Sequence, residues 1–82
     1  MAVLVDEARW PAHGRHWAHL VSDTSLAELH AFARAAGLPP RGFDHDHYDV
    51  PDTQVPQLVA AGAQPVGSRE LLRRLVAAGL RV

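Results

Sequence analysis

The chain has no cysteine, so disulfides and thiolate metal sites are both excluded. Any metal ion would therefore need nitrogen and oxygen ligands. No apolar run approaches the roughly 20 residues that a membrane span requires, and the first ten residues lack the basic flank and apolar segment of a secretory signal. These absences predict a cytoplasmic protein with no membrane partner.

A strong charge imbalance is also absent. The formal net charge of -1 gives no whole-chain attraction to nucleic acid. The chain has no phosphate-binding P-loop, no GxGxxG and no GxSxG nucleophile motif. Because 48% of its 82 residues are hydrophobic, it is too apolar for a disordered chain, and we expect one small domain spanning residues 1–82.

Short apolar segments alternate with helical patterns along the chain. Residues 2–5, 17–22 and 64–66 predict strands, with a further short strand at 48–50. Segment 10–15 contains Pro and Gly and predicts a loop. Segment 41–50 predicts a second, polar loop that ends in the short strand at 48–50. The order predicts an α/β fold, with a small sheet of three or four strands and about three packed helices.

Helix signals are clearest in segment 25–36, where Ser25 and Glu28 have capping-box spacing ahead of an apolar stripe. A second helix is predicted to end at Ala61, capped by Asp52 or Thr53, with its apolar side chains at Val55, Leu58 and Val59. Ser68 is predicted to cap the last helix. The apolar face of that helix is expected to form a homodimer contact through Leu71, Leu72, Leu75 and Val76.

Histidine is concentrated in two short stretches among acidic residues. The stretches hold His13, His16 and His19, and then His45 and His47 among Asp44, Asp46 and Asp49. Imidazole and carboxylate groups ligate metals and move protons near neutral pH. Since loops at strand ends commonly carry binding groups, we expect a site formed by Asp6, His19, His47 and Asp49. The spacing matches no standard metal motif, and His13 and His16 are expected to be solvated.

Other residues of these segments allow two interpretations. His30 borders the apolar stripe of the first helix, so it is either a half-buried, hydrogen-bonded histidine or a catalytic imidazole facing the loops. Arg9, Arg15 and Arg41 either bind a small anion or pair with the neighbouring acids. Trp10 and Trp17 either pack internally or form the floor of a pocket.

The segments VDEARWPAHGRHWAHLVSDTSLAELHAFARAAGLP, DHYDV and AAGAQPVGSRELLRRL resemble a small bacterial and bacteriophage family of unknown function. The resemblance covers nearly the whole chain and implies a complete small domain. It falls on Asp6, His19, Asp23, His30, His47, Tyr48 and Asp49. It implies no established activity, but it singles out His19 and His47 over the other loop histidines.

The sequence therefore predicts a His/Asp site that binds a divalent metal ion such as Zn or Mn, or a small anion. If the protein is an enzyme, hydrolysis of a phosphoester or a related bond suits these residues best, with His19, His47, Asp49 and His30 as the catalytic candidates. The alternative is a non-enzymatic accessory module that binds a protein or nucleic-acid partner. Convergence of the candidate residues in one place favours the site, and dispersal favours the module.

Overall fold

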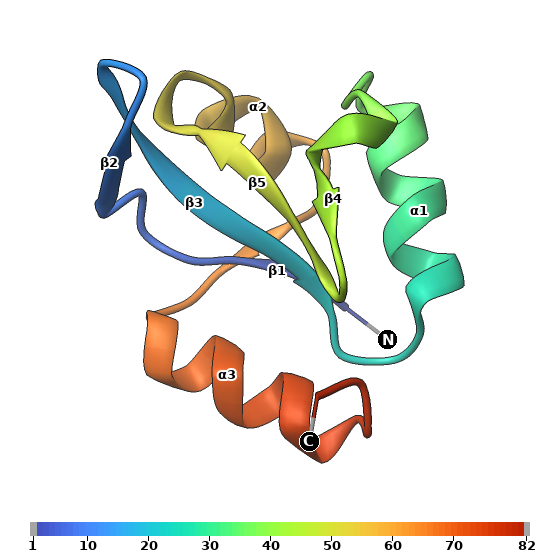
Figure 1. The fold of residues 1–82 in the computed structure, drawn as a ribbon. Helices are drawn as coiled ribbons and strands as arrows, with labels where there is room; N and C mark the ends of the chain where they lie inside the picture. The colour runs from blue at the N-terminus through green and yellow to red at the C-terminus, as the bar shows by residue number, and fades with distance from the viewer. Residues whose placement is uncertain (1, 82) are drawn as a thin grey trace.

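A computed structural model describes residues 2–81, which form one mixed sheet with α-helices on both faces (Figure 1). The strands are β1 (Val3–Val5), β2 (Trp10–Ala12), β3 (Arg15–Ser22), β4 (Phe43–Asp44), β5 (His47–Pro51) and β6 (Gln64–Pro65). The α-helices of this range are α1 (Leu26–Ala35), α2 (Val55–Ala60) and α3 (Ser68–Ala77). Two short 3₁₀ helices span Pro40–Gly42 and Asp52–Gln54. The predicted α/β class with three helices is confirmed.

The strands lie in the order β4-β5-β3-β1-β6, and β2 pairs with the first half of β3. Only the pairing of β1 with β6 is parallel among the strands of residues 2–81. β3 is the longest strand and pairs with β1, β2 and β5. It is therefore the element to which most other strands are attached.

The expectation of three or four strands was wrong, because both predicted loops contain β-hairpins. β2 turns into β3 at His13 and Gly14, whose φ angles of 52° and 77° suit a two-residue type I′ turn. Pro11 is tolerated in β2 because this short strand pairs only with β3. β4 and β5 form the second hairpin, with His45 at a φ of 59° in its turn.

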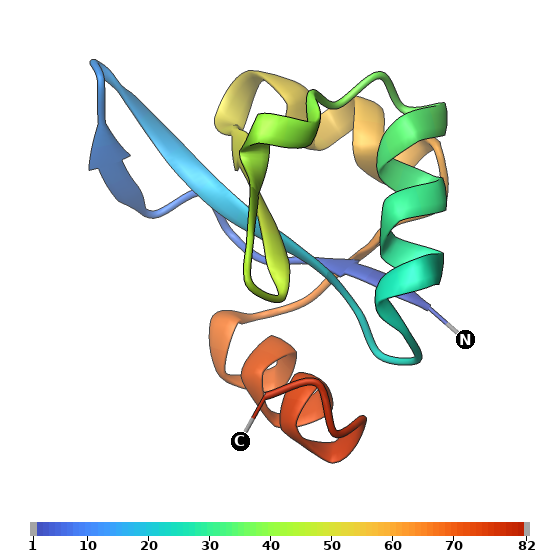
Figure 2. The same ribbon diagram turned by 45° about the vertical axis from the view of Figure 1, so that its right-hand side comes forward.

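The sheet separates two apolar layers. Side chains of α1 and α2 pack on one face, where Val3, Val5 and Leu20 lie beneath Leu29 and Leu58. The other face is covered by α3, which packs Leu71 and Leu75 on Leu4 and Val21. Figures 1 and 2 show α3 on the opposite side of the sheet from α1 and α2. Because β1 is buried on both faces, its sequence is uninterruptedly apolar.

Helix α1 begins where its capping signal predicted. Ser25 Oγ accepts a hydrogen bond from the Glu28 backbone N–H at 3.1 Å. The Glu28 carboxylate does not return directly to the Ser25 backbone. Instead it accepts from Ser22 Oγ at 2.5 Å, and Ser22 Oγ accepts from the Ser25 N–H. Ser22 thus completes the cap from the end of β3.

Helix α3 differs from the prediction at its start and on its apolar face. Gly67 occupies the capping position, and the Ser68 hydroxyl donates to Asp6 rather than capping the helix. Leu71 and Leu75 are buried, but Leu72 and Val76 are 43% and 47% exposed. The homodimer remains a prediction, and two of its four expected contact residues are already packed in the core.

Helix α2 starts after a 3₁₀ turn and has no side-chain cap, so the predicted caps at Asp52 and Thr53 were wrong. Leu58 is buried, whereas Val59 is exposed rather than inward. Within residues 2–81, no helix has the length and apolar character needed to cross a membrane.

Candidate metal centre

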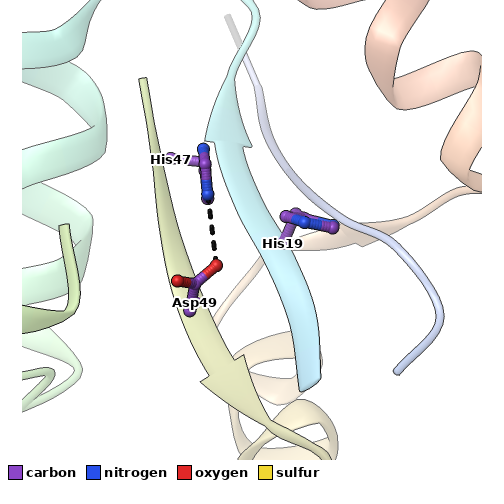
Figure 3. Close-up of side chains that lie close together, drawn as sticks. All are labelled: His19, His47 and Asp49. Atoms are coloured by element: carbon purple, nitrogen blue, oxygen red, sulfur yellow. Dashed lines mark ion pairs between the residues drawn. The ribbon is translucent and has the colours of Figure 1, made fainter. Parts of the chain in front are cut away.

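His19, His47 and Asp49 come together on the face of the sheet that carries α3 (Figure 3). His19 of β3 lies directly opposite Asp49 of β5 in the antiparallel register. His47 precedes Asp49 by two residues, so strand alternation places both on the same face. One ligand atom from each side chain can be chosen such that all three lie within 4.8 Å of one another.

The two imidazole rings touch edge to face. Their centroids are 5.1 Å apart and their planes are inclined by 73°. His47 Nε2 lies 3.1 Å from Asp49 Oδ1, and the His47 side chain is only 15% exposed. The cluster is thus partly shielded from water, which strengthens its electrostatic interactions.

Asp6, which lies outside the cluster of three, fixes the position of His19. Its Oδ1 accepts from the His19 backbone N–H at 2.7 Å, and its Oδ2 lies 3.0 Å from His19 Nδ1. Ser68 Oγ donates to the same Oδ2 at 3.1 Å. Since an ionised carboxylate only accepts, Nδ1 carries the proton and Nε2 of the neutral ring is free for a ligand.

The contact between Asp6 and His19 favours the ionised carboxylate of Asp6 and the protonated imidazole of His19. The hydrogen bond to Asp6 raises the pKa of His19, against the opposing effect of burial. Burial raises the pKa of Asp6, but the contacts with His19 and Ser68 outweigh burial and bring this pKa below its ordinary value. Asp6 is therefore held as a carboxylate although it is only 4% exposed.

A second carboxylate, Asp46, supports His47. His47 Nδ1 lies 2.8 Å from Asp46 Oδ1. Arg81 donates to both oxygens of Asp46, from Nε and one terminal nitrogen, at 2.7 Å each. The hydrogen bonds from Arg81, aided by His47 and opposed by burial, lower the pKa of Asp46 to about 2.

Sequence reasoning missed the roles of Asp46 and Arg81. Asp46 lies in the same histidine-rich stretch as Asp44, and no feature of the sequence distinguishes the two. Arg81 lies 35 residues away at the end of the chain, and no motif links the two. Only the packing of α3 against the sheet brings Arg81 to this place.

The geometry suits a small cation with room for a further ligand. Four tetrahedral ligands at about 2.0–2.2 Å from zinc lie roughly 3.4 Å apart, so side-chain movements of about 1 Å would close this cluster. In each imidazole, Nε2 is the nitrogen available to a metal ion, and Nδ1 lies within hydrogen-bond distance of a carboxylate. Such a carboxylate is the usual support of a metal-bound histidine. A cleft of about 160 Å³ between the sheet and α3 gives access to His19 and His47.

Asp6 is not one of the three converging residues but contacts His19 directly, whereas His30 does not join the site. Asp6 lies behind His19, with both oxygens engaged. His30 contacts the opposite face of the sheet, where its Nδ1 lies 2.7 Å from Tyr48 Oη and its ring packs on Phe43. Tyr48 stands between His47 and Asp49 in β5, so alternation directs it away from them.

The three arginines expected at an anion site are exposed, and none of them lines the cleft that gives access to His19 and His47. Arg9 follows β1 and Arg15 begins β3 beside the hairpin turn, whereas Arg41 lines a separate, larger cleft that also touches Asp49. None of the three forms an ion pair within residues 2–81. His13 and His16 are exposed, as expected of solvated residues.

Comparison with known protein families identifies a family whose function is unknown. The family model described as a protein of unknown function (DUF4031) matches residues 3–78. This match confirms the predicted resemblance to a small domain of unknown function, while the bacterial and bacteriophage origin stays a prediction. No curated protein matches the chain. No solved structure matches it either.

Proposed function

The chain belongs to the DUF4031 family of unknown function, and we propose that it binds a divalent metal ion, such as Zn²⁺ or Mn²⁺, through His19, His47 and Asp49. The observation that carries this proposal is the convergence of three ligand atoms within 4.8 Å, drawn from two neighbouring strands. Two nitrogen donors and one oxygen donor suit these ions, and thiolate is not available to the chain.

The carboxylates behind the two histidines support the same proposal. Asp6 and Asp46 are only 4% and 7% exposed, and each accepts from an imidazole Nδ1. Such contacts orient metal-binding imidazoles and increase their basicity. We assign Asp6 and Asp46 to positioning, since the oxygens of both are already engaged.

We further propose hydrolase-like chemistry on a phosphoester or a related substrate. Three protein ligands with an open fourth position are typical of catalytic zinc sites, whereas structural zinc sites are closed by four protein ligands. A metal ion held there would polarise a phosphoryl oxygen and lower the pKa of its bound water. His19, His47 and Asp49 would hold the ion, and His30 has no part in this step because it faces away.

Metal titration of untagged protein tests the binding proposal. Zn²⁺ and Mn²⁺ are titrated against wild type, the His19→Ala/His47→Ala variant and the matched His13→Ala/His16→Ala variant, which removes two exposed histidines. Metal at a hundred times its Kd stabilises the folded state by about 2.7 kcal/mol, which raises Tm by roughly 10–20 °C for a small domain. Wild type and the matched control should show this shift, and the cluster variant should not.

Equal shifts in wild type and the cluster variant would reject metal binding by these histidines. If neither metal shifts wild type, a His–carboxylate acid–base or anion pocket replaces the metal site as the proposal. Hydrolysis of a chromogenic phosphodiester with and without metal then tests the chemistry separately. Its loss in the cluster variant but not in the matched control would support the hydrolase proposal.

The alternative is a non-enzymatic accessory module that binds a protein or nucleic-acid partner. Dispersed site residues were expected for such a module. The convergence of His19, His47 and Asp49 favours a metal site, although His30, Arg9 and Arg15 do not take part in it. Cytoplasmic location and homodimer formation remain predictions from the sequence.

A further inference from the structure

Helix α3 covers only one end of the sheet face that carries the metal cluster. Helix α3 packs over Leu4 and Val21, at the far end of β3 from the hairpin turn. Figure 2 shows the β2–β3 hairpin projecting away from α1, α2 and α3. This hairpin carries Trp10 and Trp17, whose rings stack with centroids 6.0 Å apart and an interplanar angle of 24°.

Trp10 links the aromatic pair to the metal cluster. Its ring centroid lies 6.1 Å from that of His19, and the residue is 36% exposed. Trp17 is anchored by a hydrogen bond from Nε1 to the Ala12 carbonyl at 2.9 Å. A fixed and a more exposed indole therefore stand side by side next to His19.

A cleft of about 440 Å³ opens beside this pair. Its walls include Trp10, Trp17, Pro51, Arg41 and Asp49. The volume lies within the range of small-molecule sites, which are mainly apolar with a few polar groups. Asp49 belongs both to this cleft and to the metal cluster, so the cleft and the cluster adjoin at this residue.

Arg41 gives the cleft an available positive charge. Arg73, Arg74 and Arg81 all pair with carboxylates. Arg41 is exposed and forms no such pair within residues 2–81. Its planar guanidinium suits the oxygens of a phosphate.

We propose that this cleft binds a nucleotide, with the base on the Trp10–Trp17 pair and the phosphate between Arg41 and the metal cluster. Aromatic side chains stack on any nucleobase, because every base has a π-face. The assignment of the phosphate rests on the proposed metal site, because the Asp49 carboxylate alone would repel it. The base contact does not depend on the metal.

Binding is measured by NMR from the two indole N–H signals, using adenosine monophosphate, adenosine and ribose 5-phosphate as probes. Each probe is titrated once in EDTA and once with Zn²⁺. The variants are Trp10→Ala, Trp10→Phe, Arg41→Ala and the control Arg34→Ala, which removes an exposed arginine outside the cleft. A short oligonucleotide distinguishes a free nucleotide from one within a strand.

In EDTA, adenosine should bind and shift the indole signals, and ribose 5-phosphate should not. Trp10→Ala should weaken adenosine binding at least about fivefold, and Trp10→Phe should restore most of it. With Zn²⁺, adenosine monophosphate should bind more tightly than adenosine. Arg41→Ala should reduce this preference about tenfold, and Arg34→Ala should leave it unchanged.

Two results would overturn the cleft proposal. One is the absence of base-dependent binding in EDTA, and the other is equal binding by the Arg41→Ala and Arg34→Ala variants in Zn²⁺. Failure of the metal site looks different, because adenosine binding would persist in EDTA while Zn²⁺ would give no thermal shift. Oligonucleotide binding at least tenfold tighter than the monophosphate would reassign the occupant to a nucleotide within a strand.

Discussion

Asp6 contacts His19 at two points, although the two residues lie 13 positions apart in the sequence. One carboxylate oxygen lies 2.7 Å from the His19 backbone nitrogen, and the other lies 3.0 Å from its ring Nδ1. The backbone contact fixes where the strand residue stands, and the ring contact fixes which nitrogen carries the proton. Together they orient His19 before any ligand arrives, which reduces the ordering that binding requires.

Replacing Asp6 tests this positioning. In Asp6→Asn, the amide nitrogen cannot accept a hydrogen bond, so at least one of the three donors to Asp6 loses its partner. We expect Zn²⁺ affinity to fall about 10–100-fold and the free energy of unfolding to fall by about 1–3 kcal/mol. Calorimetric titration and urea denaturation measure the two effects. The exposed neighbour Glu7→Gln serves as control, and unchanged Zn²⁺ affinity in Asp6→Asn would contradict the positioning role.

Asp46 should matter far more than Asp44, which lies two residues away in the same hairpin. Asp46 accepts from His47 and from two nitrogens of Arg81, whereas the Asp44 side chain is 60% exposed and lies 3.5 Å from an exposed His45. Because Arg81 is itself partly exposed, we expect Asp46→Asn to lower the unfolding free energy by about 1–2 kcal/mol. Urea denaturation should show almost no change for Asp44→Asn. Similar effects of the two substitutions would refute the distinction.

The pair of Asp23 and Arg74 should make stability depend on acid. Burial raises the pKa of Asp23, but hydrogen bonds from the Ala2 N–H, Arg74 and Thr24 outweigh burial and lower it overall. A lowered folded-state pKa stabilises the fold above the unfolded value of about 3.9. This contribution is lost as the pH falls through the folded-state pKa.

Removing the Asp23 carboxylate should therefore make the free energy of unfolding depend less on pH in the acidic range. Asp23→Asn should lower the unfolding free energy by about 1–2 kcal/mol at pH 7, with a smaller difference at pH 2. Chemical denaturation at both pH values measures the change. Glu7→Gln is the control, because Glu7 is exposed and forms no ion pair within residues 2–81. A difference from wild type that stays constant between pH 7 and pH 2 would argue against this role.

Helix α3 allows a matched comparison between buried and exposed leucine. Leu75 is fully buried against the sheet, and Leu72 is 43% exposed. Leu75→Ala should cost about 2–5 kcal/mol of stability, and Leu72→Ala about 0.5 kcal/mol or less. Thermal and urea unfolding at two protein concentrations measure both. A large, concentration-dependent effect of Leu72→Ala would instead support the predicted homodimer.

Much of the local structure follows from short-range sequence signals. The Ser25 cap and the apolar stripe predicted α1 because a helix start and its buried face depend on residues three or four positions apart. The apolar run at residues 2–5 predicted β1. Both hairpins were missed, because neither His13-Gly14 nor His45-Asp46 is the Asn-Gly or Asp-Gly pair typical of tight turns.

The sequence by itself determined the α/β class, the main helices and the pool of nitrogen and oxygen donors. Only the tertiary structure decided which donors meet. The β3–β5 register sets His19 opposite Asp49, and the fold brings Ser68 and Arg81 to Asp6 and Asp46. Strand alternation sent Tyr48 to the other face, where His30 of α1 contacts it. Cross-strand register depends on pairing between segments about 30 residues apart, and a shift by one residue would move every side chain to the opposite face.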